Sequence, residues 1–147
     1  MPGVAFFDLD RTLIAVNSAS GWVRREWRQG HVGALDALRA TGWIGLYGLG
    51  VANMGKVVRA AVATLRGTPE DEIRRRTLVF WEEEVRAQLR PGARAAVERH
   101  RQAGDRLVLL TSSSPYLSEP IAAELGLDDW LCNRFEVVDG VFTGETL

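Results

Sequence analysis

Two short apolar runs organise the chain, and each ends abruptly in polar residues. Val4–Phe7 stops at Asp8, and the run 107–110 stops at Thr111. Continuous apolar runs of four to eight residues with polar boundaries are typical of strands buried on both faces of a parallel sheet. In open parallel sheets, ligands bind beyond the carboxyl ends of the strands. If the two strands are neighbours, the polar residues that follow them converge on one crevice.

The segment between the two runs carries helical signals and no strand pattern. Thr68-Pro69 followed by three acids is a strong helix start, because it combines a capping hydroxyl, an N1 proline and charges that suit the helix dipole. Glycines weaken a helix prediction for the apolar stretch 43–52. We therefore interpret 14–88 as an all-helical insertion. The expected helices run from Asn17 or Ser18 through Trp27, then over 32–39, 56–65 and 68–88.

After residue 88, helices and strands alternate. We expect a helix over 93–103, the strand 107–110 and a helix over 116–125. The short strand 134–138 then returns over 141–143 through Asp139-Gly140, which is a two-residue hairpin signal. Alternating strands and helices predict a parallel sheet with right-handed crossovers. The fold class is therefore α/β, with a core formed by 1–13 and 89–147 and a helical cap formed by 14–88.

Composition narrows the functional classes. The 147 residues are 46% hydrophobic and carry a net charge of −1, which suits a globular protein and gives no field that would attract nucleic acid. Cys132 is the single cysteine, so an internal disulfide and a multi-cysteine metal site are excluded, and a reducing, cytoplasmic location is expected. The sequence shows no signal-peptide pattern, and the stretch 43–52 is too short to span a bilayer.

The crevice residues suggest phosphoryl transfer. Two carboxylates at a strand end are unfavourable without a cation, and Mg²⁺ is the hard cation that suits oxygen ligands. Asp8 can act as a nucleophile and Asp10 as a general acid and base. The backbone N–H of Leu9, with hydroxyl and amide groups of Thr111 and Ser112, can hold phosphoryl oxygens. Two simpler interpretations stay open: a turn with two solvated acids, and a cluster of capping hydroxyls before Pro115.

Several motifs resemble one hydrolase superfamily. DLDRTL (8–13) resembles the DxDxT signature of the haloacid-dehalogenase-like hydrolases, and LVLLTSSS (107–114) is similar to their second motif. The helical insertion and VVDGVFTGE resemble the phosphoserine-phosphatase-like subgroup. The resemblance implies that Asp8 is the nucleophile and a Mg²⁺ ligand, that Asp10 is the acid/base and binds the metal through its carbonyl, and that Thr111 binds phosphate. The implied reaction is hydrolysis of a small phosphorylated metabolite through an aspartyl-phosphate.

The sequence also departs from that family. The family carries a lysine and an acidic pair after the second motif, but no lysine follows Thr111 here. The pair Asp128-Asp129 does not end an apolar strand. The chain thus resembles the N-terminal part of a longer hydrolase, with a core incomplete at its C-terminus. We expect little or no phosphatase activity from these 147 residues alone.

The substrate and partners stay open at this stage. Asn17 lies where the phosphoserine-phosphatase-like subgroup carries a glutamate that binds the substrate amine. This difference argues against phosphoserine as the substrate. Arg24, Lys56 and Arg59 in the cap can meet a second anionic group. The stretch 43–52 either packs within the cap or faces an apolar substrate or a membrane. The alternatives to a metabolite phosphatase are a non-catalytic scaffold and a phosphatase for a lipid-like phosphate, and an incomplete sheet would offer an edge for a homodimer.

Overall fold

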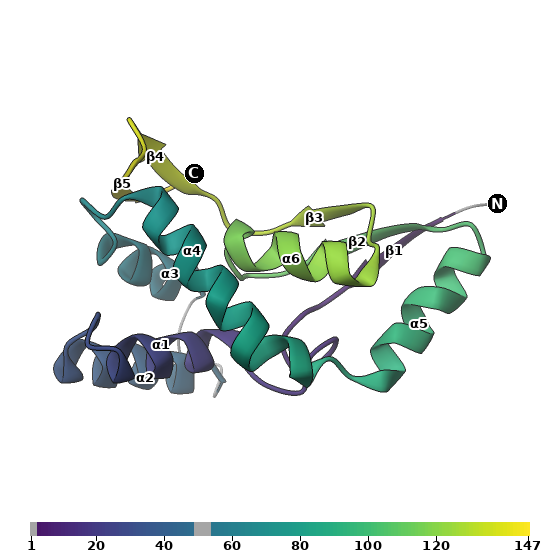
Figure 1. The fold of residues 1–147 in the computed structure, drawn as a ribbon, viewed down its shortest axis with the longest axis horizontal. Helices are drawn as coiled ribbons and strands as arrows, with labels where there is room; N and C mark the ends of the chain where they lie inside the picture. Colours follow the sequence, from purple (N-terminus) through teal and green to yellow (C-terminus); the bar gives the residue numbers. More distant parts are fainter. Residues whose placement is uncertain (1–2, 49–53) are drawn as a thin grey trace. The chain divides into compact units, whose positions relative to one another are not determined.

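The computed structural model describes residues 3–48 and 54–147 (Figure 1). Helices and strands follow each other in the predicted α/β manner. None of the helices in these two ranges is long and apolar enough to cross a membrane. The elements are β1 (Val4–Phe7), α1 (Ser18–Arg28), α2 (Ala34–Gly48), α3 (Met54–Ala63), α4 (Glu70–Phe80), a π-helical turn (Trp81–Val85), a 3₁₀ turn (Arg86–Gln88), α5 (Pro91–Gln102), β2 (Arg106–Leu110), α6 (Pro115–Leu125), β3 (Asp129–Leu131), β4 (Phe135–Val138) and β5 (Val141–Thr146).

A three-stranded parallel sheet with the order β1-β2-β3 forms the core. The register pairs Phe7 with Leu109 and Leu110 with Leu131. The α/β fold class and the pairing of the two apolar runs are therefore confirmed. Strand β3 is a correction, because Asp129 begins a strand where the sequence pattern indicated none. The strand has only three residues and is largely exposed, so no apolar run marks it.

The two faces of this sheet differ in how well they are covered. Ala5, Phe7, Leu107 and Leu109 alternate onto one face and are buried, and the Phe7 ring meets the edge of His100 on α5. The opposite face carries four apolar side chains that are about half exposed: Val4 (53%), Phe6 (57%), Leu110 (50%) and Leu131 (51%). Two successive right-handed crossovers in the same direction place both connecting helices on one face. Val108, which pairs with Phe6 on the other face, is buried, so the described residues cover this face in part and less completely than the first.

The chain forms two compact units whose bounds differ from the expected core and cap. The first unit holds 1–18 and 74–134, and the second holds 19–73 and 135–147. The division into a core of 1–13 and 89–147 and a cap of 14–88 stays a prediction. The β4–β5 hairpin pairs with the turn before α4, where the N–H of Gly67 donates to the Phe142 carbonyl and the N–H of Phe142 donates to the Thr68 carbonyl.

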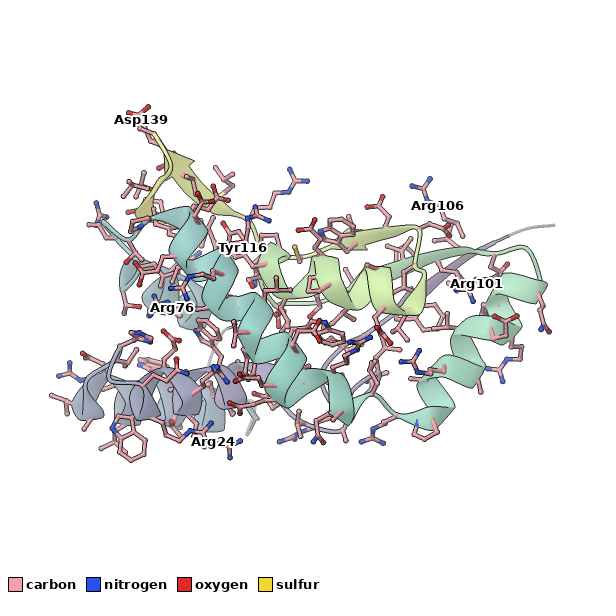
Figure 2. The ribbon with its side chains drawn as sticks, in the orientation of Figure 1. Arg24, Arg76, Arg101, Arg106, Tyr116 and Asp139 are labelled. Atoms are coloured by element: carbon pink, nitrogen blue, oxygen red, sulfur yellow. The ribbon has the colours of Figure 1, made fainter. Side chains whose placement is uncertain are left out.

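Local turn chemistry explains the hairpin itself. Asp139 (φ 52°) and Gly140 (φ 75°) are both left-handed, as a tight two-residue hairpin turn requires. Asp139 lies at the tip of the hairpin (Figure 2). The expected two-residue turn is confirmed. Helix α2 differs from expectation because it continues through Gly42 and Gly45 to Gly48 instead of ending near residue 39.

Candidate active site

The carboxylate of Asp8 lies directly after β1 and is exposed. The Thr12 hydroxyl donates a hydrogen bond of 2.8 Å to Asp8 Oδ2. A tight turn brings the two residues together, because the N–H of Thr12 donates to the Leu9 carbonyl and the N–H of Leu13 donates to the Asp8 carbonyl. One oxygen of the carboxylate is thus fixed by its own loop, while the group as a whole faces solvent.

The loop after Asp8 reverses sharply at Arg11, which has a left-handed φ of 61°. This conformation is unfavourable for a residue with a Cβ and persists where the surroundings enforce it. Leu13 and Ile14 supply that constraint, since both side chains are almost completely buried. The N–H of Ile14 donates to the carbonyl of Leu9, whose own side chain is fully buried. The Leu9 peptide is therefore held rigidly beside Asp8.

Asp10 is half-buried and caps the start of α1. Its Oδ1 accepts a hydrogen bond of 2.7 Å from the backbone N–H of Ser18. Burial raises the pKa of Asp10 above its ordinary value, and the negative charge of Asp8 adds to that increase. The hydrogen bonds from Ser18 and the Arg11 cation lower the same pKa and only partly offset the effect of burial. A carboxyl group that holds its proton more tightly than usual suits a general acid and base.

The parallel register brings the second motif beside the first. Since Phe7 pairs with Leu109, the carboxyl ends of β1 and β2 lie side by side, and Asp8 and Thr111 are the residues that directly follow the two strands. The N–H of Thr111 donates to the Leu131 carbonyl, and its Oγ1 accepts a bond of 3.1 Å from the N–H of Ser113. These bonds keep the residue at the carboxyl end of β2, as the apolar run predicted. The assignment of Thr111 and Ser112 to phosphate binding stays a prediction.

Asn133 is a structural partner of this loop that the sequence pattern did not reveal. Its Nδ2 donates to the Ser112 carbonyl, and its backbone N–H donates to the Ser113 carbonyl at 3.2 Å. Asn133, which lies two residues after β3, thereby ties the loop after β2 to the segment after β3. No signal in the sequence points to this residue, because the strand that positions it was itself not predicted.

The predicted cap residues are divided between the two units. Asn17 is half-buried immediately before α1 and belongs to the same unit as Asp8 and Asp10. Arg24 on α1, marked in Figure 2, and Arg59 on α3 are exposed and belong to the second unit. Lys56 lies on α3, but its side chain is outside the described part of the chain. Of the stretch 43–52, residues 49–52 are likewise outside it.

The donor set at the strand end fits magnesium chemically. The Asp8 carboxylate and the Asp10 carbonyl are hard oxygen ligands, and Mg²⁺ typically takes one or two carboxylates together with water and phosphate oxygens. Within residues 3–48 and 54–147, no cluster of three or more His, Cys, Asp or Glu side chains could hold a metal ion.

A pocket of about 470 Å³ lies beside this loop in the first unit. Its lining includes Thr12 and Leu13 of the loop, and Arg90 and Ala93 at the start of α5. The lining is apolar apart from Thr12 and Arg90. The N–H of Arg90 donates to the Leu13 carbonyl at 3.0 Å, which ties the start of α5 to the Asp8 loop.

Comparison with known proteins links this geometry to one family. A family model described as haloacid dehalogenase-like hydrolase matches residues 5–147. A phosphoserine phosphatase of Mycobacterium tuberculosis is 28% identical over 141 residues, which are 96% of this chain and 31% of that protein. A histidinol-phosphatase of Neisseria meningitidis is 25% identical and is matched over 98% of this chain and 66% of its own length.

A solved structure shows the same architecture. The crystal structure of a protein of unknown function from Bordetella pertussis is 26% identical, with a TM-score of 0.86, over 100% of this chain and 67% of that protein. The chain thus spans between about one third and two thirds of the length of the two curated relatives.

Proposed function

Because the chain belongs to the haloacid dehalogenase-like hydrolase family, we propose that it carries the nucleophile of a magnesium-dependent phosphomonoester hydrolase. The observation that carries the proposal is the pairing of two different carboxyl groups on one loop. Asp8 is exposed and fixed by Thr12, whereas Asp10 is half-buried with a raised pKa. Nucleophilic and acid–base roles require such a difference in environment.

The proposed reaction proceeds in two steps. A carboxylate oxygen of Asp8 attacks the phosphorus in line, the bond to the ester oxygen breaks, and Asp10 gives its proton to the leaving alkoxide. Asp10 then takes a proton from the water that attacks the aspartyl-phosphate, which releases inorganic phosphate and restores Asp8. Mg²⁺, when bound to the Asp8 carboxylate and the Asp10 carbonyl, would offset the charge of the phosphoryl group.

The remaining proposed roles concern binding. The N–H of Leu9 and the polar groups of Thr111 and Ser112 would hold the phosphoryl oxygens. The parallel pairing of β1 with β2, which brings the carboxyl ends of the two strands together, supports this arrangement. Asn17 and the cap cations Arg24, Lys56 and Arg59 are proposed to meet the rest of the substrate. The names of the two relatives denote phosphatases of different small metabolites, so we propose a small phosphate monoester without naming one.

The proposal predicts that this chain alone is weakly active, because too few metal ligands are present in the part that the structure describes. Binding of a phosphoryl mimic is therefore a better test than turnover. We expect calorimetric titration with beryllium fluoride and Mg²⁺ to show weak, metal-dependent binding. Asp8→Asn should abolish the signal, and Asp71→Asn, a matched change at an exposed acid of α4, should leave it unchanged. Equal binding by Asp8→Asn would refute the nucleophile, and no binding by any form would favour the non-catalytic scaffold.

A further inference from the structure

Helix α2 is apolar on both of its sides. One side packs within the second unit, where Ala37 is buried and Ile44 is half-buried. The other side, called here the outward face of α2, consists of Leu35, Leu38, Arg39, Trp43 and Leu46. Its four apolar side chains are exposed, by 61% (Leu35), 69% (Leu38), 44% (Trp43) and 42% (Leu46). A helix that is apolar all round normally has apolar surroundings on every side.

The outward face is continuous. Leu35, Leu38, Gly42 and Leu46 follow spacings of three and four residues, which place side chains in one stripe along a helix. A Cβ added at Gly42 or at Gly45 would meet no atom of residues 3–48 and 54–147 within 4 Å, so these residues leave the surface between the large side chains open as well. The stripe therefore forms one accessible apolar surface rather than scattered single residues.

The charge pattern identifies the environment that suits this face. Arg39 lies within it, and its ion pair with Asp36 is long (3.6 Å) and highly exposed on both sides. Helix α1 of the same unit carries the exposed Arg24 and Arg28 and the half-exposed Trp27. Glu26, the acid of α1, is buried, so the exposed charges of the two helices are three arginines (Arg24, Arg28 and Arg39) and the carboxylate of Asp36.

These features together fit a lipid surface better than a protein core. Tryptophan and arginine are enriched where a helix lies at a membrane interface, with apolar side chains in the acyl region and cations among the headgroup phosphates. An apolar protein partner would remove the water around the Arg39 guanidinium group without replacing it. A lipid headgroup would instead offer this cation a phosphate as counter-charge. We propose that the outward face of α2 docks on an anionic membrane surface, with the helix lying parallel to the bilayer. The docking is independent of the proposed hydrolase reaction.

Vesicle flotation tests this docking with the chain itself. We expect the wild type to float with vesicles of phosphatidylcholine and phosphatidylglycerol, and to float much less with phosphatidylcholine alone or at high salt. The double variant Leu35→Gln/Leu38→Gln should reduce the bound fraction on the order of tenfold, because two apolar anchors are lost. Leu78→Gln on α4, where the leucine is 49% exposed, is the matched control and should bind like the wild type.

If circular dichroism shows that the double variant does not fold properly, a variant that removes a charge still tests the proposal. Arg39→Gln removes no large apolar side chain, and we expect it to weaken binding to the anionic vesicles only. The proposal is overturned if the wild type fails to float with either kind of vesicle, or if Leu78→Gln loses as much binding as the double variant. Self-association in the absence of lipid that the double variant abolishes would also overturn it, because the face would then bind a second copy.

Discussion

At Asp8, one hydroxyl group decides how the carboxylate is presented. The Thr12 hydroxyl donates to Asp8 Oδ2, and this bond spans four residues of a loop that is strained at Arg11. We expect Thr12→Val to weaken capture of beryllium fluoride with Mg²⁺ on the order of tenfold, since a hydrogen bond to a charged group is removed. Calorimetry measures the loss. Thr64→Val, which removes an exposed hydroxyl that donates to the Ala61 carbonyl, is the control. Unchanged capture by Thr12→Val would mean that the loop orients Asp8 without the hydroxyl.

Asp10 should make stability depend on pH in a direction opposite to that of most carboxylates. Its pKa is raised in the folded state by burial, so folding favours the protonated form. The resulting stabilisation is fully present below the pKa that Asp10 has in the unfolded chain. It is lost as the pH rises through the higher pKa of Asp10 in the folded protein. Asp10→Asn keeps an acceptor for the Ser18 N–H and removes the buried charge. We expect the variant to be more stable than the wild type at neutral pH.

Urea unfolding at a series of pH values measures this effect. The stability difference between Asp10→Asn and the wild type should shrink as the pH falls through the raised pKa of Asp10 toward the ordinary range of an aspartate, because the wild-type carboxyl group then takes up its proton. Asp71→Asn controls for a general loss of negative charge. A difference that stays constant across the series would show that burial does not govern the titration of Asp10.

At the scale of single elements, the β4–β5 hairpin depends on its turn. Gly140 has a φ of 75°, and a Cβ added there would meet nothing within 4 Å. We therefore expect Gly140→Ala to destabilise the protein by about 1 kcal/mol through backbone strain alone. Gly92→Ala is the matched control, because Gly92 is equally open but lies in α5 without a positive φ. Thermal or urea unfolding compares the two variants, and equal effects would contradict the strain argument.

These elements also show which parts of the fold could be predicted from sequence. The β1 and β2 runs and the Asp139-Gly140 turn were predictable, because burial on both faces and a left-handed turn each demand particular residue types. The short, exposed β3 was not predictable, since its pairing depends on β2 rather than on its own residues. The pairing of the hairpin with residues 67–68 likewise depends on distant residues. Its contacts with Gly67 and Thr68 are long-range backbone bonds that leave no local pattern.

The candidate site follows the same division. Asp8, Asp10 and Thr111 could be placed at strand ends because local patterns fix where a strand stops, and the parallel register then sets the two motifs side by side. Asn133 and the burial that raises the pKa of Asp10 arise from tertiary structure, so the sequence carried no sign of them. The length of helix α2 could not be predicted, because tertiary packing on Ala37 and Ile44 overrides the weak helix propensity of its glycines.

At the scale of the whole molecule, the three-stranded sheet of the described residues has a free edge at β1 and an exposed apolar face, and both features favour association with another chain. Among the described strands, β1 pairs with β2 alone, and its sequence VAFF contains neither charge nor proline to discourage pairing with another strand. Phe6 and Val4 of this strand are more than half exposed. Because α5 and α6 follow crossovers that place them on the opposite face, neither helix covers these side chains. We propose that the isolated chain self-associates through β1.

Analytical ultracentrifugation over a range of concentrations tests this proposal. We expect the wild type to show a concentration-dependent dimer and Phe6→Lys to remain a monomer, because a charge on the apolar face opposes both stacking and edge pairing. Leu78→Lys introduces the same charge at an exposed leucine of α4 and should still dimerise. Phe6 precedes the Asp8 loop by only two residues, so binding of beryllium fluoride is measured in parallel. A wild type that stays monomeric at all concentrations, or a Phe6→Lys variant that dimerises as strongly, would exclude β1 as the contact.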